Sequence, residues 1–497
     1  MDEIKLSDDV FEQIEEFDHD DLTEEQESLI DKLIIDEELK ERYKENGLCE
    51  NCKQPNTEYN WCQECSWLCE NCNRRNTEYD WCQPCIINNL QSNFKHWTSR
   101  NHEVDEFIQK AQLNAINSDQ IIEWIEYDNF EDVEYLAKGG FGTTFKAVWK
   151  DGPISNWDYD NNRWERNGEA KVALKCLHNS QDITADFLKE IESNILVCES
   201  TRGWVVRCFG ITKDPKTNNF IMVMKLIRGS MRQHLNNNFI SHKWWEKLNN
   251  LCLIAIGLID IHDKGLIHHD FHCGNILSDF HNNAYITDLG LCQPANIEHS
   301  QSNNKKIYGV LPYMAPEVLR GKEYTQKSDI YGFGIIAYEI CTGLPPYHDI
   351  AHEEFLAMKI CQGLRPKSNY KVPQLILDVI NQCWDADPLK RPNAYELHHL
   401  LYDLYFDINN RVDSIIYGQA KEADEINKKS FSTVQSSLSF TSTLSYTTHP
   451  QAVYTSRLLD FKNLPEPKNA DNNDLEYSDS LKMDFTKIDI NSKDERN

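Results

Sequence analysis

The chain has 497 residues and is 40% hydrophobic, so it can form at least one large core and has room for two or three domains. Its formal net charge of −29 disfavours nucleic acid and other polyanions as general ligands. The sequence contains no apolar run of the roughly 18 to 20 residues that a membrane helix needs, and it does not begin with a signal-peptide pattern. We therefore expect a soluble, cytoplasmic protein whose 17 cysteines are metal ligands or buried thiols rather than disulfides.

Residues 1–46 form an acidic segment that is predicted to be helical. Thr23, followed three residues later by Gln26, matches the capping box that begins many helices. Apolar residues then recur near helical spacing until Gly47. The pattern predicts one acidic amphipathic helix, which either packs on its own domain or docks a partner.

Residues 47–86 contain LCENCKQPNTEYNWCQEC and, twenty residues later, the near copy LCENCNRRNTEYDWCQPC. Each copy has two Cys-x2-Cys pairs, and four thiolates close a tetrahedral Zn²⁺ site so that no catalytic position stays open. Because each copy holds four ligands, two sequential structural zinc sites are favoured over an interleaved arrangement; disulfides and redox switching are the alternatives. The expected zinc ligands are Cys49, Cys52, Cys62 and Cys65 in the first copy and Cys69, Cys72, Cys82 and Cys85 in the second.

Each copy is similar to the small zinc fingers of the Ran-binding-protein type, through Asn56, Asn76 and Trp67 beside the cysteine pairs. The spacing between the pairs is one residue shorter than in those fingers. The resemblance implies binding of single-stranded RNA or of ubiquitin, and the acidic surroundings, with one Arg74-Arg75 pair, argue against RNA. We expect this module to bind a protein such as ubiquitin or to be purely structural.

The flanking regions are less specific. Residues 87–129 contain two short helical patterns, at 104–111 and 121–125, and are predicted to be a helical linker that braces the next domain. Residues 406–497 are rich in Ser, Thr, Asn and Asp and too poor in spaced apolar residues to build a core. This tail is predicted to be disordered, with phosphorylation sites as its use.

Residues 130–405 contain, in order, the parts that phosphoryl transfer needs. In the glycine-rich turn LAKGGFG, residues 136–142, the missing β-carbons let backbone amides approach phosphate oxygens, although an ordinary hairpin turn explains this motif alone equally well. Val172-Ala-Leu-Lys175 is a strand ending in a lysine for the α- and β-phosphates. Glu190, in a helical stretch, is the expected partner of Lys175, with a surface salt bridge as the alternative.

The most specific signal is HHDFHCGN at residues 268–275, followed thirteen residues later by Asp288-Leu289-Gly290. It supplies Asp270 as the carboxylate near the substrate hydroxyl, and Asn275 and Asp288 as two ligands of Mg²⁺. Because these motifs follow the earlier ones in the expected order along the chain, they indicate phosphoryl transfer rather than a chance match of short patterns.

With these motifs the chain resembles the eukaryotic protein kinases, most closely the tyrosine-kinase-like branch of serine/threonine kinases. The resemblance extends to Ala315-Pro316-Glu317, to Asp329 in SDIYGFG and to Arg391 in DPLKRP. It implies an α+β bilobal fold with a β-rich small lobe and a helical large lobe, Arg391 paired with Glu317, a buried Asp329, and transfer of the ATP γ-phosphate to protein hydroxyls in signal transduction. The implied catalytic residues are Asp270, Lys175, Asn275 and Asp288. The implied ATP and Mg²⁺ ligands are Leu136, Gly139, Gly140, Phe141, Gly142, Thr144, Lys175, Glu190, Met224, Asn275 and Asp288.

The chain departs from the kinase pattern at four positions. Ala137 replaces the first glycine of the loop. His269 replaces an arginine that in the family grips an activation-loop phosphate, so we expect weak dependence on phosphorylation there. The histidine is expected to pack, with a pH dependence of activity as the alternative. His272 replaces a lysine and can donate one hydrogen bond to a γ-phosphate oxygen. Because Val310 replaces a threonine, the preference for Ser or Thr over Tyr rests on the branch alone.

Three further points stay open from the sequence. The connection formed by residues 150–170, about twenty residues, is too long for a tight hairpin, so we expect it to project from the small lobe. The sequence does not indicate its purpose. The alternative function is a catalytically weak scaffold that acts through its zinc module. The activation-segment residues Ser300, Ser302 and Tyr308 are potential modification sites.

Overall fold

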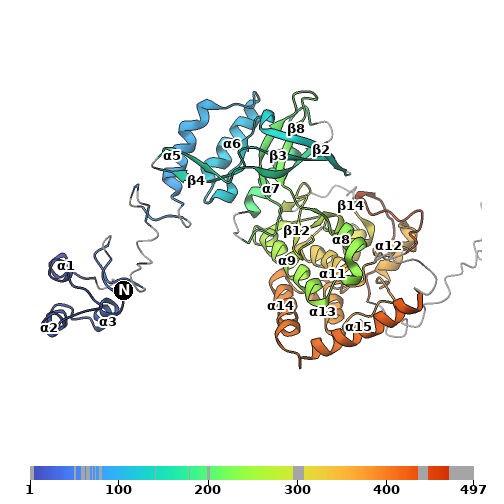
Figure 1. The fold of residues 1–497 in the computed structure, drawn as a ribbon. Helices are drawn as coiled ribbons and strands as arrows, with labels where there is room; N and C mark the ends of the chain where they lie inside the picture. Colours follow the sequence, from blue (N-terminus) through green and yellow to red (C-terminus); the bar gives the residue numbers. More distant parts are fainter. Residues whose placement is uncertain are drawn as a thin grey trace, which may run out of the picture. The chain divides into compact units, whose positions relative to one another are not determined.

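The computed structural model divides into two compact units, residues 1–227 and residues 228–497, which are drawn in Figure 1. Each unit is described by itself. The structure describes residues 5–49, 52–57, 62, 68–69, 71–72, 74–77, 81–139, 142–159, 161–177, 180–198, 202–294, 307–434 and 446–469. Within these residues, no helix is both long enough and apolar enough to cross a membrane.

The N-terminal segment folds into three short helices, α1 (Asp8–Ile14), α2 (Glu24–Leu33) and α3 (Glu37–Asn46). The capping box of Thr23 and Gln26 is confirmed at the start of α2. The prediction of one continuous helix is wrong, because the backbone is extended at Ile34 and the Asp36 side chain caps a new helix. The apolar side chains of all three helices form one small cluster, which includes Ile14, Ile30 and Tyr43.

The linker contains α5 (Gln83–Asn93) and α6 (His102–Asn114), and α6 confirms the first predicted helical pattern. The second predicted helix, at 121–125, is wrong. There, β1 (Glu123–Trp124) pairs in parallel with β7 (Cys208–Lys213), in a stretch rich in the β-branched residues that favour strands. Gly210 in β7 allows this pairing, since a β-carbon there would lie 2.1 Å from the Glu123 carbonyl oxygen.

A six-stranded sheet forms the centre of the first unit, in the order β1-β7-β8-β6-β3-β2. Its other strands are β2 (Phe130–Lys138), β3 (Gly142–Trp149), β6 (Ala170–Leu177) and β8 (Phe220–Lys225). The core behind it includes Val172, Leu174 and Val223; Val172 and Leu174 alternate with more exposed residues along β6, whereas β8 is buried from Phe220 to Met224. With helix α7 (Ala185–Val197), this unit confirms the β-rich small lobe.

The 150–170 insertion is a hairpin of β4 (Ile154–Asp158) and β5 (Arg163–Arg166) that packs on its own unit. Trp157 and Trp164 meet edge to face across the hairpin, with ring centres 4.7 Å apart. Both rings pack against the cluster that contains Trp81 beside the second cysteine repeat. The expected excursion is therefore a folded hairpin, whose tryptophans pack against the cluster beside the linker.

The second unit is mainly helical and confirms the helical large lobe. Its helices up to residue 410 are α8 (Met231–Asn238), α9 (Trp244–Asp263), α10 (Pro316–Leu319), α11 (Gln326–Thr342), α12 (Glu354–Cys361), α13 (Gln374–Cys383) and α14 (Ala394–Asn410). Its short strands are β9 (Gly229–Ser230), β10 (Leu266–Ile267), β11 (Ile276–Ser278), β12 (Ala284–Ile286), β13 (Gln293–Pro294) and β14 (Ile307–Gly309). Most side chains of α11 are buried, as expected for a helix at the centre of a lobe.

The predicted disordered tail is wrong for two described stretches of residues 406–497. Helix α15 (Ile415–Val434) buries Ile416, Ala420 and Ala423, a helical spacing that the Ser- and Asn-rich composition obscured. Residues 446–469 then lie along the large lobe, where β15 (Arg457–Leu459) pairs antiparallel with β14 (Figure 1). The physical reason is that both stretches find hydrogen-bond and apolar partners that are distant in sequence.

Candidate active site

Lys175 and Glu190 form an ion pair in the small lobe, as the sequence predicts. Lys175 Nζ lies 2.6 Å from Glu190 Oε1, and these side chains are 15% and 6% exposed. Glu190 reaches the strand from α7, whose N-terminus is capped by Thr184. The low exposure of both groups separates this pair from an ordinary surface salt bridge.

The glycine-rich turn lies between β2 and β3. The Gly139 amide donates to the Gly142 carbonyl over 2.8 Å, which closes the turn after β2; Gly140 and Phe141 lie outside the described residues. A β-carbon on Gly142 would come 2.2 Å from the Cys176 carbonyl oxygen, so only glycine fits there.

Cross-strand register places the remaining predicted ATP ligands of the first unit. Thr144 pairs with Lys175, and Met224 pairs with Ala173. Leu136 is exposed on β2, whereas Met224 is buried on β8. The structure thus brings Thr144 next to Lys175 and places Leu136 and Met224 on other strands of the same sheet.

In the large lobe, Asp270 and Asn275 lie in one tightly bonded loop. The Asn275 side-chain amide donates to the Asp270 carbonyl oxygen over 2.9 Å, and the Asn275 backbone amide donates to His272 O over 2.9 Å. The pairing of β11 with β12 then brings Asn275 opposite Thr287, whose amide donates to Asn275 O over 3.0 Å. Asp288 therefore follows directly beside Asn275, with its backbone at φ 67°.

A buried carboxylate, Asp329, anchors the loop that carries Asp270. Asp329 at the start of α11 accepts hydrogen bonds from the His268 and His269 amides, at 2.9 and 3.4 Å, and lies 3.0 Å from His262 Nε2. His269 has φ 69°, a left-handed conformation that needs such support. Its ring stacks on Tyr324 with centres 4.3 Å apart, which matches the expectation of a packing histidine.

His272 has a defined orientation beside Asp270. Its Nδ1 accepts a hydrogen bond from the Gly274 amide over 3.1 Å, so in the neutral ring the proton lies on Nε2. That Nε2 faces Asp270 Oδ2 at 3.4 Å. Burial opposes ionisation of Asp270, but hydrogen bonds from His272 and Ser456, together with nearby charge, outweigh it and lower the pKa of the Asp270 carboxyl.

Sequence reasoning missed a residue at this site, Ser456. Its hydroxyl donates to Asp270, with Oγ 2.7 Å from Oδ1 and 2.5 Å from Oδ2, and it lies 3.5 Å from His272 Nε2. The available signal was the stretch AVYTSRLL, 452–459, whose apolar residues stand out in a polar tail.

The buried pair implied by the resemblance is present near this loop. Arg391 donates to both carboxylate oxygens of Glu317, at 2.6 and 2.8 Å, in the two-pronged geometry that arginine favours. Val310 follows β14 and is buried.

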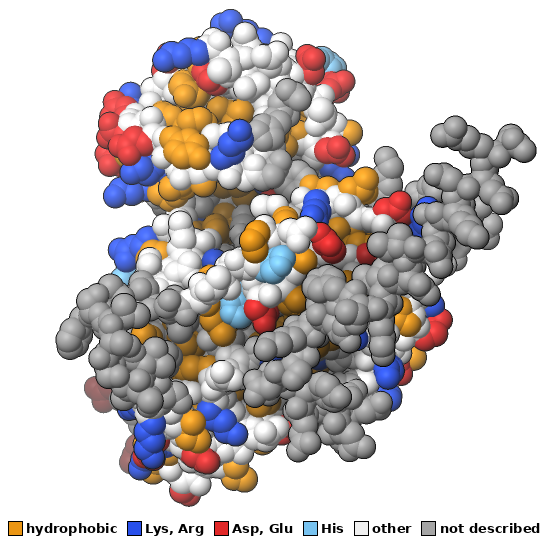
Figure 2. All heavy atoms as spheres, turned by 90° about the vertical axis from the view of Figure 1, so that its right-hand side faces the viewer, with side chains coloured by type: hydrophobic (Ala, Val, Ile, Leu, Met, Phe, Trp, Pro, Cys, Tyr) orange, Lys and Arg blue, Asp and Glu red, His pale blue; other side chains and the backbone are white. Residues whose placement is uncertain are grey.

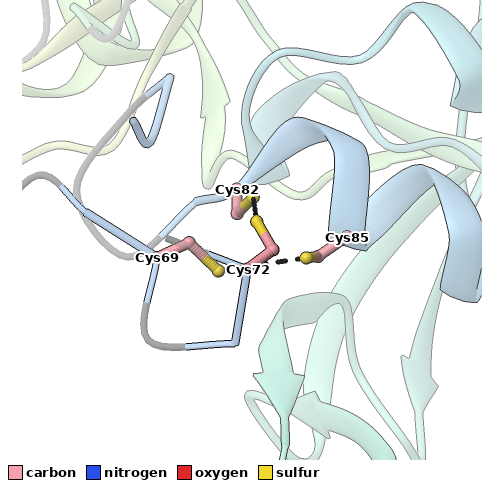
Figure 3. A group of neighbouring side chains, drawn as sticks. All are labelled: Cys69, Cys72, Cys82 and Cys85. Atoms are coloured by element: carbon pink, nitrogen blue, oxygen red, sulfur yellow. Dashed lines mark hydrogen bonds between the residues drawn. The ribbon is translucent and has the colours of Figure 1, made fainter. Parts of the chain in front are cut away.

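The second cysteine repeat forms a compact sulfur cluster, with the four side chains converging in Figure 3. Cys72 Sγ lies 3.5 Å from Cys82 Sγ, and Cys69 Sγ lies 3.9 Å from Cys85 Sγ. A Zn²⁺ tetrahedron with Zn–S bonds of about 2.3 Å has edges of about 3.8 Å, so this cluster fits the ion. Hydrogen bonding from the Arg74 backbone lowers the pKa of the Cys72 thiol to about 7.

The first repeat brings Cys49, Cys52 and Cys62 together in the same way, with 3.7 Å between the last two sulfurs. Cys65, the predicted fourth ligand, lies outside the described residues. Each cluster draws its cysteines from one repeat, which agrees with two sequential sites rather than an interleaved pair.

The motif residues described above are of the kinds that a phosphoryl-transferring enzyme uses. The sequence profile of the family described as "Protein tyrosine and serine/threonine kinase" matches residues 130–401, more than half of the chain. The chain therefore belongs to the protein tyrosine and serine/threonine kinase family.

Several curated proteins are similar to this region. "Probable serine/threonine-protein kinase roco5" of Dictyostelium discoideum is 30% identical over 299 residues, which cover 56% of this chain and 10% of that protein. "Serine/threonine-protein kinase STY17" of Arabidopsis thaliana is 27% identical over 246 residues, which cover 48% of this chain and 41% of that protein. The matches thus span less than half the length of either relative.

Proposed function

We propose that this chain is an ATP-dependent protein kinase that transfers the γ-phosphate to serine or threonine hydroxyls of proteins in signal transduction. The observation that carries the proposal is Asp270, a buried carboxylate with a lowered pKa that already accepts a hydrogen bond from a serine hydroxyl. Kinase family membership and the serine/threonine kinase names of the relatives support it. A catalytically weak scaffold is not favoured, because the predicted catalytic residues are all present.

The proposed roles follow the chemistry of phosphoryl transfer. Lys175, held by Glu190, would bind phosphate oxygens, and Asn275 and Asp288 would hold Mg²⁺, which neutralises charge on the transferred group. Asp270 orients the attacking hydroxyl and receives its proton. His272, whose Nε2 proton faces Asp270 Oδ2, is proposed to donate a hydrogen bond to a γ-phosphate oxygen during transfer.

The glycine-rich turn is proposed to cover the nucleotide. Gly139 and Gly142 lack β-carbons, so a phosphate could approach the backbone of the turn closely, and Gly140 and Phe141 complete the turn by sequence. Leu136, Thr144 and Met224 are proposed to line the nucleotide site.

The N-terminal cysteine clusters are proposed to hold one structural Zn²⁺ each. The sulfur spacing in the second repeat supports this, and Cys65 would complete the first set by sequence. A protein partner, ubiquitin among the candidates, is proposed for this module. Nucleic acid is not proposed as a partner, because the chain is acidic; on the face drawn in Figure 2, which does not show this module, described basic and acidic side chains are interspersed.

A cytoplasmic location is proposed from the composition.

The proposal is tested by incubating the intact, zinc-loaded chain with labelled ATP, Mg²⁺ and a generic protein substrate. Phosphoamino-acid analysis should find label on serine and threonine, and Asp270→Asn should abolish it. Label on tyrosine alone would refute the hydroxyl preference. Equal labelling by the intact chain and Asp270→Asn would refute the kinase assignment.

A further inference from the structure

Residues 446–469, which we call the docked segment, make an extended series of contacts with the large lobe. Its first part is held near α12: the His449 amide donates to His348 O over 2.7 Å, and the Val453 amide donates to His352 Nδ1 over 3.0 Å. Tyr454 packs edge to face on the His352 ring and donates its hydroxyl to Pro346 O over 2.9 Å.

The middle of the docked segment adds a strand to the activation segment. β15 pairs with β14 in the register Tyr308↔Leu458, with Leu459 buried and Leu458 half exposed. The Tyr308 hydroxyl also donates to Ser456 O over 3.1 Å. Strand addition of this kind is a general mode of peptide recognition, in which main-chain bonds give affinity and alternate side chains enter pockets.

The end of the docked segment contacts the large lobe through an ion pair. Arg320 contacts both carboxylate oxygens of Glu466 and donates to Leu464 O over 3.2 Å. The Lys468 amide then donates to Cys361 O over 2.9 Å. Contacts at both ends leave the position of Ser456 determined by the whole segment rather than by one hydrogen bond.

Ser456 is the point at which this segment meets the catalytic carboxylate. Its Oγ is within 2.7 Å of both Asp270 oxygens, whereas the neighbouring hydroxyl residue Thr455 is exposed. The Ser456 side chain reaches Asp270 through its single methylene. Hydrogen-bond reach from the carboxylate to the hydroxyl proton is the geometric requirement for a catalytic base.

We propose that residues 446–469 occupy the protein-substrate site of this kinase and that Ser456 is its phosphate acceptor within the same chain. The inference rests on the proposed kinase function and names the first substrate of that site. Because the segment is tethered to the lobe, its effective concentration is in the millimolar range typical of short linkages, and it competes strongly with separate proteins.

The transfer step is balanced with ATP as the only co-reactant. Ser456 Oγ attacks the γ-phosphorus and forms a P–O bond, while the bond from that phosphorus to the β,γ-bridging oxygen breaks and its electron pair leaves with ADP. The proton of Oγ passes to Asp270. Phosphorylation adds about −1.5 to −2 charges beside the Asp270 carboxylate, and like-charge repulsion weakens the docking. The modification therefore opens the site to other proteins.

The contacts also indicate which protein substrates this site takes. They place an aromatic residue two positions before the acceptor serine and a buried leucine three positions after it, as Tyr454 and Leu459 show. Separate substrates are expected to share this pattern in extended conformation.

The test follows phosphate on Ser456 by peptide mapping, using the intact zinc-loaded chain with ATP and Mg²⁺ over about a hundredfold range of enzyme concentration. A generic protein substrate is present in the same reaction. The first-order rate constant for Ser456 phosphorylation should not change with enzyme concentration, because the reaction is intramolecular. Thr455→Ala is the matched control and should keep this rate, whereas Ser456→Ala should lose the site and phosphorylate the added protein more slowly.

A second variant weakens docking without touching the catalytic loop. Glu466→Gln removes the charge partner of Arg320 and should slow Ser456 phosphorylation several-fold while speeding the first turnovers on the added protein. A first-order rate constant for Ser456 phosphorylation that rises in proportion to enzyme concentration would overturn the inference. So would label on the added protein with none on Ser456. If neither gains phosphate, the kinase assignment itself fails.

Discussion

Replacement of Arg391 by methionine should destabilise the large lobe far more than replacement of a surface arginine. The Arg391 guanidinium is fully buried and donates to Glu317 at 2.6 and 2.8 Å, to Lys327 O at 2.9 Å and to Asp385 O at 2.8 Å. Arg391→Met leaves the Glu317 carboxylate buried without its cation. Breaking a buried pair in this way costs about 3 to 5 kcal/mol.

For a unit of this size, about 1 kcal/mol shifts the melting temperature by roughly 2 to 4 °C. Arg391→Met should therefore lower the large-lobe transition by roughly 6 to 20 °C in differential scanning calorimetry. The matched control is Arg411→Met, which breaks an exposed pair with Asp407 and should cost only about 0.3 to 0.5 kcal/mol.

The double variant Arg391→Met with Glu317→Met separates the two causes. It removes both charges, so it should be less destabilised than Arg391→Met alone. The reasoning is refuted if Arg391→Met melts within the range of Arg411→Met, or if adding Glu317→Met makes the single variant worse.

Three further outcomes follow from the described contacts. Glu190→Gln should lower ATP turnover by about tenfold or more, because Lys175 loses the charge that holds it, whereas Glu192→Gln on the same helix should keep wild-type turnover. Removal of zinc by a chelator should shift the fluorescence of the buried Trp81, which adjoins Cys82; Trp81→Phe should remove that change, and an unchanged wild-type spectrum would contradict the metal site. Burial lowers the pKa of His242 to about 3 from an unfolded value near 6.5, so the unfolded state binds more protons and large-lobe stability falls as pH drops through 6.5. The loss from about pH 7.5 to about pH 5 is about 2 kcal/mol from this group, and His242→Gln should flatten the dependence of the melting temperature on pH.

Sequence patterns predicted the local features of the fold and of the candidate sites well, since the residues responsible are close together in sequence or have a specific chemistry. The capping box at Thr23 depends on residues three positions apart, the partner of Lys175 followed from charge and motif order, and the partner of Arg391 followed from the resemblance to protein kinases. The grouping of cysteines by repeat followed from four ligands per copy.

The failures share a different physical cause. The break between α2 and α3 depends on one capping aspartate, and β1 depends on a parallel partner far along the chain. Ser456 lies 186 positions from Asp270, and its segment has too little apolar surface to suggest a fold by itself. Tertiary hydrogen bonds, rather than local propensity, order residues 446–469.

The measurement that tests the central claim most directly is Mg²⁺-dependent conversion of ATP to ADP by the intact, zinc-loaded chain, beside Asp270→Asn and Lys175→Met. The account predicts turnover in the intact chain and its loss in both variants. Turnover that is no greater in the intact chain than in the variants would contradict it and make the scaffold function the leading explanation.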